Sequence, residues 1–186
     1  MDIMGGTLAD LQKRGRKVHA LLQTPPKQEA LVRKLVEDWV VKPDISTDMD
    51  GKAAAFSTAD AALAASGTVT LELALSGIPA VSIYKLDPLM RLFRRHVKIW
   101  TASLPSLIAD QPVIPEFIDD MMRPGQLARE LEKLARPGPS RDAQLQGFEL
   151  VRERMQTEWP SGDLAAERVL FWVDKKQILS DSQKVS

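Results

Sequence analysis

The sequence has 186 residues, of which 44% are apolar and 27% are charged, and its 25 lysines and arginines balance 25 aspartates and glutamates. These values are ordinary for a globular domain and exclude a disordered, collagen-like or coiled-coil chain. A net charge of zero gives no global basic field that would attract nucleic acid. The lack of cysteine excludes disulfides, iron–sulfur clusters and thiol nucleophiles.

The first half of the chain alternates predicted helices and strands. Gly77 and Pro79 mark the end of one helix, because glycine and then proline commonly follow a helix C-terminus. The helices are predicted at 4–14, 27–36, 51–57 and 68–75, and the strands at 17–22, 43–47, 61–65 and 80–84. This rhythm with short loops predicts a Rossmann-like α/β fold, in which helices cover both faces of a parallel sheet.

The second half of the chain is predicted to be mainly helical. A helix is expected at 88–100, and a loop punctuated by prolines then runs to residue 115. Three further helices are expected, one from Pro124, one after 137–139 and one over 164–173. This pattern predicts an α/β domain with a helical C-terminus.

The chain is long enough for one domain with its own core. We expect that domain over residues 1–174 and a polar tail over 175–186. No apolar run approaches the roughly 18 residues that span a bilayer, and the N-terminus has no apolar core of a signal peptide. The expected location is therefore the cytoplasm, either free or at the periphery of a membrane.

The segment from Ala65 to Glu72 is the most informative for function. A predicted strand ends, Ser66 and Gly67 turn tightly, and a helix begins at Thr68 with free N–H groups and a positive dipole end, which favour a phosphate. Glu72 lies one turn further, where its carboxylate can accept hydrogen bonds from two sugar hydroxyls. The alternative is structural, with Ser66 only capping the helix and Glu72 solvated at the surface.

Four sequence blocks resemble the donor domain of the lipid-A-disaccharide synthase family. They are SGTVTLELALSGIPAV at 66–81, YKLDPL at 84–89, SLP at 103–105 and VIPEF at 113–117, with a basic helix after the second. The order and spacing of the blocks are more specific than any one of them. The resemblance extends loosely from about residue 4 to about residue 173.

The resemblance implies the C-terminal half of a two-domain glycosyltransferase of the GT-B type. Family members join UDP-2,3-diacylglucosamine to 2,3-diacylglucosamine 1-phosphate at the cytoplasmic face of the inner membrane. They form the lipid A disaccharide and release UDP, and no cofactor or metal is expected. The acceptor-binding and catalytic groups of family members lie largely in their N-terminal domain, so no catalytic residue is assigned in this chain.

The resemblance also implies UDP-binding positions in this chain. Three match the loop near the diphosphate and one matches the carboxylate at the ribose. An aromatic–basic pair ends the next strand, where ligands of open α/β sheets gather, and a seventh position, Ser106, directly follows the SLP block. For the aromatic residue of that pair, a packed position at the strand end is an equal alternative. The implied UDP-binding residues are Ser66, Gly67, Thr68, Glu72, Tyr84, Lys85 and Ser106.

The chain departs from the family pattern in two places. Ser106 replaces the usual asparagine, and Asp110 and Gln111 replace a glycine–arginine pair, which removes a cation that would compensate the diphosphate. The family also has a strand and a Pro-Gly-Ser-Arg loop just before a helix like 4–14, and an entire N-terminal domain before those. We therefore expect a fragment with little or no transferase activity, which self-associates through apolar surface left bare on its C-terminal helices.

Residues 88–100 form a second candidate site. Apolar residues at helical spacing share this segment with several basic ones, a pattern typical of a helix that lies on an anionic membrane. The alternative is a helix packed on the core with a solvated basic face. The predicted membrane contacts are Met90, Phe93, Arg94, Arg95, Val97, Lys98 and Trp100.

Other chemistries find little support in the sequence. His19 and His96 have no metal-ligand spacing around them, and Asp119 and Asp120 are predicted to be exposed helix charges rather than an acid–base pair. Two alternatives to the resembled enzyme stay open. One is a degenerate remnant that acts as an interaction module without UDP affinity. The other is the donor domain of a different UDP-sugar enzyme, such as an epimerase or the peptidoglycan glucosaminyltransferase.

Overall fold

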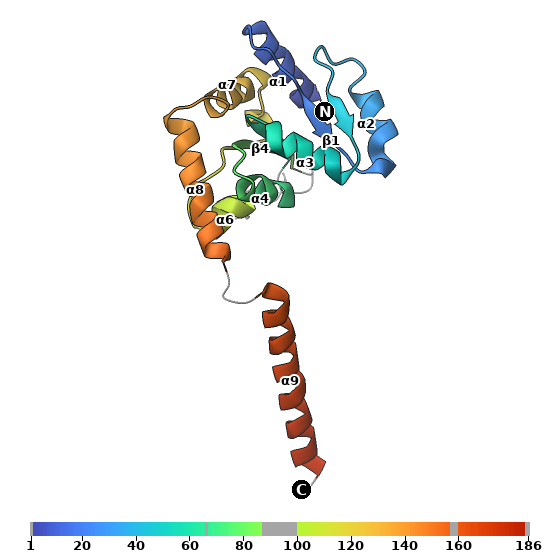
Figure 1. Ribbon diagram of the computed structural model, residues 1–186, viewed down its shortest axis with the longest axis vertical. Helices are drawn as coiled ribbons and strands as arrows, with labels where there is room; N and C mark the ends of the chain where they lie inside the picture. Colours follow the sequence, from blue (N-terminus) through green and yellow to red (C-terminus); the bar gives the residue numbers. More distant parts are fainter. Residues whose placement is uncertain (1, 66, 87–99, 157–159, 185–186) are drawn as a thin grey trace. The chain divides into compact units, whose positions relative to one another are not determined.

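In a computed structural model, the chain forms two compact units, Met1–Arg154 and Met155–Ser186 (Figure 1). The structure describes residues 2–65, 67–86, 100–156 and 160–184. Every strand among the described residues belongs to the first unit, where parallel strands are flanked by helices. The predicted α/β fold is therefore confirmed.

A three-stranded parallel sheet forms the centre of the first unit. Its strands are β3 (Ala62–Ala65), β4 (Ala80–Tyr84) and β5 (Glu116–Ile118), in the order β3–β4–β5. Ala64 lies opposite Ser82 in the register of the first pair. Because all three strands run in the same direction, their carboxyl ends lie along one edge of the sheet.

Helices cover both faces of this sheet, because successive strand residues point to opposite sides. On one face, α4 (Thr68–Leu75), α6 (Leu104–Ala109) and α8 (Pro139–Met155) pack on the sheet. The core of that face consists of Ala64, Leu73, Ala74, Ile78, Ala80, Ala109, Val113, Ile114, Phe148 and Val151. Each of these side chains is at most 8% exposed, so α4 rests on a closely packed layer.

The opposite face is covered by α1 (Asp2–Lys13) and α7 (Pro124–Leu134). Its core consists of Val81, Phe117, Leu127, Leu131 and Leu134, with Ile3 and Leu11 of α1 packed against them. At the polar rim, Arg16 of the chain after α1 donates to Glu132 of α7 at 2.5 Å. α1 and α7 therefore form a helical layer that closes this face.

A separate two-stranded parallel sheet contains β1 (Leu21–Gln23) and β2 (Asp44–Ser46). A short 3₁₀ turn, η1 (Pro26–Gln28), leads into α2 (Glu29–Leu35), and α3 (Met49–Thr58) follows β2. The small core of this region consists of Val32, Val36 and Trp39, with Met4, Leu8, Leu22 and Ile45 packed around it. Since Met4 and Leu8 belong to α1, that helix joins the cores of the two sheets.

Three elements between residues 61 and 86 agree closely with the sequence predictions. α4 and β4 have the predicted bounds, and β3 starts one residue later than predicted. Gly77 adopts a φ of 71°, the left-handed geometry that glycine commonly supplies after a helix. The punctuation of this segment by Gly67, Gly77 and Pro79 therefore determines where its elements begin and end.

The loop predicted up to residue 115 is wrong, because the structure contains α6 within it and β5 directly after it. Pro105 occupies the first turn of α6, where a missing N–H breaks no helical hydrogen bond. Pro115 precedes β5, and its carbonyl accepts from the backbone N of Ser82 at 2.9 Å. Pro105 thus lies in the first turn of a helix within the predicted loop, and Pro115 directly precedes a strand that the sequence did not predict.

The second unit contains α9 (Ser161–Lys184). A helix was predicted over 164–173, and α9 continues past the expected end into the segment predicted as a polar tail. A run of apolar side chains on α9 is more than half exposed: Val169, Leu170, Phe171, Trp172 and Val173. The domain boundary predicted at 174 stays a prediction.

No helix in the described ranges is long and apolar enough to cross a membrane.

Candidate functional site

Several predicted site residues meet at the carboxyl edge of the three-stranded sheet. β3 ends at Ala65 and is followed by Gly67 and Thr68, whereas β4 ends at Tyr84 and is followed by Lys85. β3 and β4 are hydrogen-bonded neighbours, so these residues lie at adjacent strand ends. Ligands of open parallel sheets bind in this position.

The start of α4 has the geometry of an anion-binding turn. Gly67 is the N-cap residue, with φ 130° and ψ −160°, a conformation essentially restricted to glycine. Its carbonyl is fixed by Thr70, whose hydroxyl donates to it at 2.7 Å and whose N–H donates at 3.2 Å. Within the described ranges no side chain caps this helix, so the backbone N–H groups of Thr68 and Val69, which precede the bonded Thr70, are available to an anion at the carboxyl edge.

Ser66, the residue predicted to cap α4, lies outside the described residues. Thr68 is exposed at the beginning of the helix, as a ligand contact there requires. A Cβ added to Gly67 would meet nothing within 4 Å, so the glycine is needed for its backbone angle rather than for space. A branched side chain at this position would therefore change the shape of the turn.

Glu72 lies one turn beyond Thr68 and takes part in an ion pair. Its Oε2 accepts from Nζ of Lys52 in α3, and the two side chains are 44% and 26% exposed. Nζ of Lys52 also lies 5.5 Å from the ring centre of Phe56. The sequence did not single out Lys52 as a site residue. Its helical spacing to Phe56 is visible in the sequence, but its pairing with Glu72 depends on tertiary packing.

Tyr84 and Lys85 are both exposed at the end of β4, and Tyr84 is 36% exposed. The chain after them is held by Asp119, whose Oδ1 accepts from the backbone N of Leu86 at 2.9 Å. Asp119 begins η2 (Asp119–Met121), has a φ of 46° and is only 8% exposed. The prediction of an exposed helix charge is therefore wrong for Asp119, which ties the end of β5 to the loop after β4.

Ser106 lies apart from the other predicted site residues. It is 1% exposed in α6, and its Oγ accepts from the backbone N of Val113 at 3.2 Å and of Ile114 at 3.5 Å. These two residues precede β5, so the hydroxyl lies near the amino end of that strand, whereas Tyr84 and Lys85 lie at the carboxyl edge. The structure thus gives Ser106 a role in holding the connection from α6 to β5.

Asp110 has a φ of 50° at the C-cap of α6, in the left-handed region that favours glycine. This is a position at which the sequence departs from the resembled family, which usually carries glycine there. Aspartate is one of the few residues that tolerate this geometry. The departure is therefore compatible with the fold, and Gln111 after it supplies no cation.

The predicted membrane segment cannot be placed, because residues 87–99 lie outside the described ranges and with them Met90, Phe93, Arg94, Arg95, Val97 and Lys98. Trp100, the last residue of the prediction, is 54% exposed.

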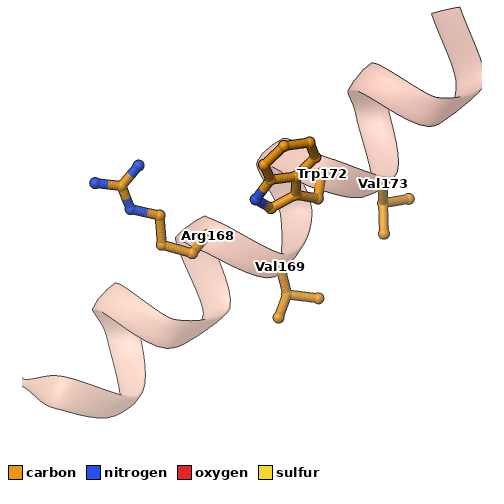
Figure 2. Close-up of a pocket in the computed structure, with 4 residues that line it drawn as sticks. All are labelled: Arg168, Val169, Trp172 and Val173. Atoms are coloured by element: carbon orange, nitrogen blue, oxygen red, sulfur yellow. The ribbon is translucent and has the colours of Figure 1, made fainter. Parts of the chain in front are cut away.

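The remaining polar clusters and hollows of the structure match no site predicted from the sequence. In the described part of the chain, no group of three or more histidine, cysteine, aspartate or glutamate residues could hold a metal ion. His19 pairs with Asp44 at 2.7 Å, and both side chains are about three-quarters exposed. On α9, a shallow hollow is lined by Arg168, Val169, Trp172 and Val173 (Figure 2).

The fold and the site define a class. This is an α/β protein of the Rossmann-like kind, with a glycine-started helix at the carboxyl edge of its parallel sheet. A family model described as lipid-A-disaccharide synthetase matches residues 2–163. The chain belongs to the lipid-A-disaccharide synthase family.

Curated relatives carry the same family name. The lipid-A-disaccharide synthase of Bradyrhizobium diazoefficiens is 39% identical over 178 residues, which are 94% of this chain and 45% of that protein. The one of Rhodopseudomonas palustris strain CGA009 is 41% identical over 164 residues, 87% of this chain and 42% of that protein. The lipid-A-disaccharide synthase of Nitrobacter winogradskyi is 36% identical over 172 residues, which are 91% of this chain and 43% of that protein. The chain thus spans less than half the length of these relatives.

Proposed function

We propose that this chain forms the donor half of a GT-B glycosyltransferase of lipid A biosynthesis. The whole enzyme joins UDP-2,3-diacylglucosamine to 2,3-diacylglucosamine 1-phosphate and releases UDP. The observation that carries the proposal is the glycine-started α4 beside Tyr84 and Lys85 in a chain of this family. This arrangement offers a nucleotide both an anion site and neighbouring side chains.

In this proposal the diphosphate of UDP binds at the first turn of α4. The N–H groups there and the positive end of the helix dipole stabilise its negative charge. Lys85 adds a cation at the end of the neighbouring strand. Because UDP is the leaving group, the same contacts stabilise the charge that develops on its phosphate as the glycosidic bond forms.

Glu72 is proposed to bind the ribose. It is 44% exposed and lies four residues after Thr68, so it is on the same side of α4 and about 6 Å further along the helix axis. A carboxylate in that position can accept a hydrogen bond from each ribose hydroxyl. Tyr84, exposed at the end of β4, supplies an aromatic surface beside the nucleotide.

The isolated chain is proposed to bind UDP without transferring sugar. More than half the length of the relatives has no counterpart in it. The family resemblance puts the acceptor site and the catalytic groups largely in that other part. Formation of lipid A disaccharide by the purified chain, from both acylated sugars, would contradict this proposal.

Calorimetric titration of the chain with UDP tests the proposed site. We expect Gly67→Val and Glu72→Ala each to weaken UDP binding by about tenfold or more, because a hydrogen bond to a charged group contributes about 1.5–3 kcal/mol. Glu130→Ala, which removes a carboxylate from a surface pair on α7, is the matched control. Unchanged UDP affinity in both site variants, or no affinity in the unaltered chain, would refute the site.

Membrane attachment is proposed separately, from the sequence pattern of residues 88–100. Arg94 and Arg95 belong to a basic segment that also carries apolar residues at helical spacing, as in interfacial helices. Replacing both with glutamate should reduce co-sedimentation with vesicles that contain anionic lipid. Binding to vesicles of neutral lipid should change little, and equal sedimentation of both proteins with anionic vesicles would contradict the proposal.

A further inference from the structure

The ion pair of Lys52 and Glu72 connects two helices at the proposed nucleotide site. Lys52 lies in the first turn of α3, which follows the carboxyl end of β2, and Glu72 lies in α4, which follows the carboxyl end of β3. The sequence separation of twenty residues shows that the pair is a tertiary contact. Glu72 is four residues after Thr68, so the lysine pairs with a carboxylate one helical turn from the proposed anion site.

The position of Lys52 is restricted by the capped start of its helix and by the ring of Phe56. The N-cap Asp48 accepts from the backbone N of Gly51 at 2.6 Å, which fixes the start of α3 directly before the lysine. The side chain passes over Phe56, with Nζ 5.5 Å from the ring centre, and only 26% of it is exposed. Such a partly desolvated, packed ammonium group has a narrower range of positions than a lysine in water.

Glu72, in contrast, is 44% exposed and has no neighbour on its own helix that would orient its carboxylate. Side chains of a helix lean toward its N-terminus, so the carboxylate extends toward Thr68 and the proposed diphosphate position. Lys52 donates to Oε2. Among the described residues the bond to Glu72 is made at Oε2, so Oε1 of this partly exposed carboxylate is available to a ligand.

We propose that Lys52 is a positioning residue that orients the Glu72 carboxylate for the two ribose hydroxyls of the donor nucleotide. This inference rests on the proposed function, because it needs a nucleotide at the start of α4. The lysine keeps its bond to Oε2 while the hydroxyls bind the carboxylate.

A general electrostatic role of Lys52 makes a different prediction. If its charge merely attracted anions to the site, its loss would weaken every uridine diphosphate equally, whatever the sugar. A positioning role acts through Glu72 and therefore affects only ligands that have ribose hydroxyls. The ratio of two affinities separates these roles, and a loss of overall stability does not change that ratio.

The experiment measures the dissociation constants of UDP and of 2′,3′-dideoxyuridine diphosphate for the full 186-residue chain by calorimetry. The variants are Lys52→Met, which keeps an unbranched apolar stem on Phe56, Lys52→Arg, which keeps the charge, and Glu72→Gln. Lys133→Met is the matched control, since Lys133 also pairs with a glutamate, Glu130, at 2.8 Å, but on α7. Circular dichroism at the temperature of the titration verifies that each variant is folded.

We expect the unaltered chain, Lys52→Arg and Lys133→Met to prefer UDP over the dideoxy analogue by about tenfold or more. In Lys52→Met and Glu72→Gln the preference should fall to about threefold or less, with the dideoxy analogue bound nearly as well as before. A preference that persists in Lys52→Met but collapses in Glu72→Gln would overturn the positioning role and leave the proposed site intact. If the unaltered chain shows no preference or binds neither ligand, the ribose assignment fails and the inference fails with it.

Discussion

The two sheets of the first unit have very unequal cores. The three-stranded sheet is covered on both faces, and Val81, Phe148 and Val151 beside it are fully buried. The two-stranded sheet has a core of three buried side chains that are 5–9% exposed, and Leu21 of β1 is 41% exposed. α4 and β4, which carry most of the proposed site, therefore rest on the better packed sheet.

The same difference implies unequal local stability. Segments with few buried apolar contacts open at a lower free energy than segments at the centre of a core. Within the site, Lys52 comes from α3, which follows β2 of the two-stranded sheet and whose Phe56 packs against the core of the three-stranded sheet. The pair with Glu72 therefore adds a polar contact where α3 already packs on the better packed region.

Phe148→Ala should give the largest loss of stability in the first unit. Phe148 lies in α8 with 0% exposure and packs on the face of the sheet that also holds α4. Removing a buried phenyl ring leaves a cavity and costs about 3–5 kcal/mol of unfolding free energy. Urea unfolding followed by circular dichroism measures the change, and a loss below about 1 kcal/mol would show that this core is loosely packed.

Gln144→Met should give the next largest effect. The Oε1 of Gln144 accepts from the backbone N of Ala80 at 2.9 Å, and its Nε2 donates to the carbonyls of Ala80 at 2.9 Å and Val113 at 3.1 Å. Methionine has a similar shape but leaves these buried groups without their partner, which costs about 3 kcal/mol in total, given about 1–3 for each unsatisfied group. Calorimetric unfolding of the two proteins tests this. An unchanged midpoint would mean that the backbone groups find other partners.

A matched pair of valines compares the two regions directly. Val151 is 0% exposed in the core of the three-stranded sheet, and Val32 is 9% exposed in the core of the two-stranded sheet. Val151→Ala should cost about 2 kcal/mol and Val32→Ala about 1 kcal/mol, because the smaller core collapses more readily around the lost methyl groups. Equal costs in urea unfolding would show that the two sheets share one evenly packed core.

The parts of the fold that the sequence predicts well are those with local punctuation. α4 lies between Gly67 and Gly77, and β4 is the apolar run that follows Pro79. Their bounds therefore follow from the turn residues and the side-chain pattern. β5 has only three residues, and its pairing with β4 is a long-range contact. Because this pairing with a distant segment is not visible in the local sequence, the strand was not predicted.

The same limit applies to the site. Gly67 and Glu72 can be singled out from the sequence because a turn and a helical spacing are local features. Lys52 cannot, because it reaches Glu72 only when α3 packs beside α4. Asp119 was read as a surface charge for the same reason, since its burial follows from its bond to the backbone of Leu86 in a distant segment.

Arg152→Met should give the smallest of these effects, and it tests how firmly α4 is held at its far end. The guanidinium of Arg152 donates from Nε to the carbonyl of Leu75 at 3.1 Å and from Nη2 to that of Ala74 at 3.5 Å, at the C-terminus of α4. A cation there also interacts favourably with the helix dipole.

Because the side chain is 32% exposed, its loss should cost only about 1 kcal/mol of unfolding free energy. Arg154→Met is the matched control, since Arg154 donates to the carbonyl of Ile108 in α6 at 2.8 Å. If the better packed sheet unfolds as one unit, both variants should lower the urea midpoint similarly. Hydrogen exchange at the amides of α4 should then rise only to the extent that global stability falls. A rise confined to α4 in Arg152→Met would instead show that this helix opens by itself, and that the arginine at its C-terminus, rather than the core beneath it, keeps the helix in place.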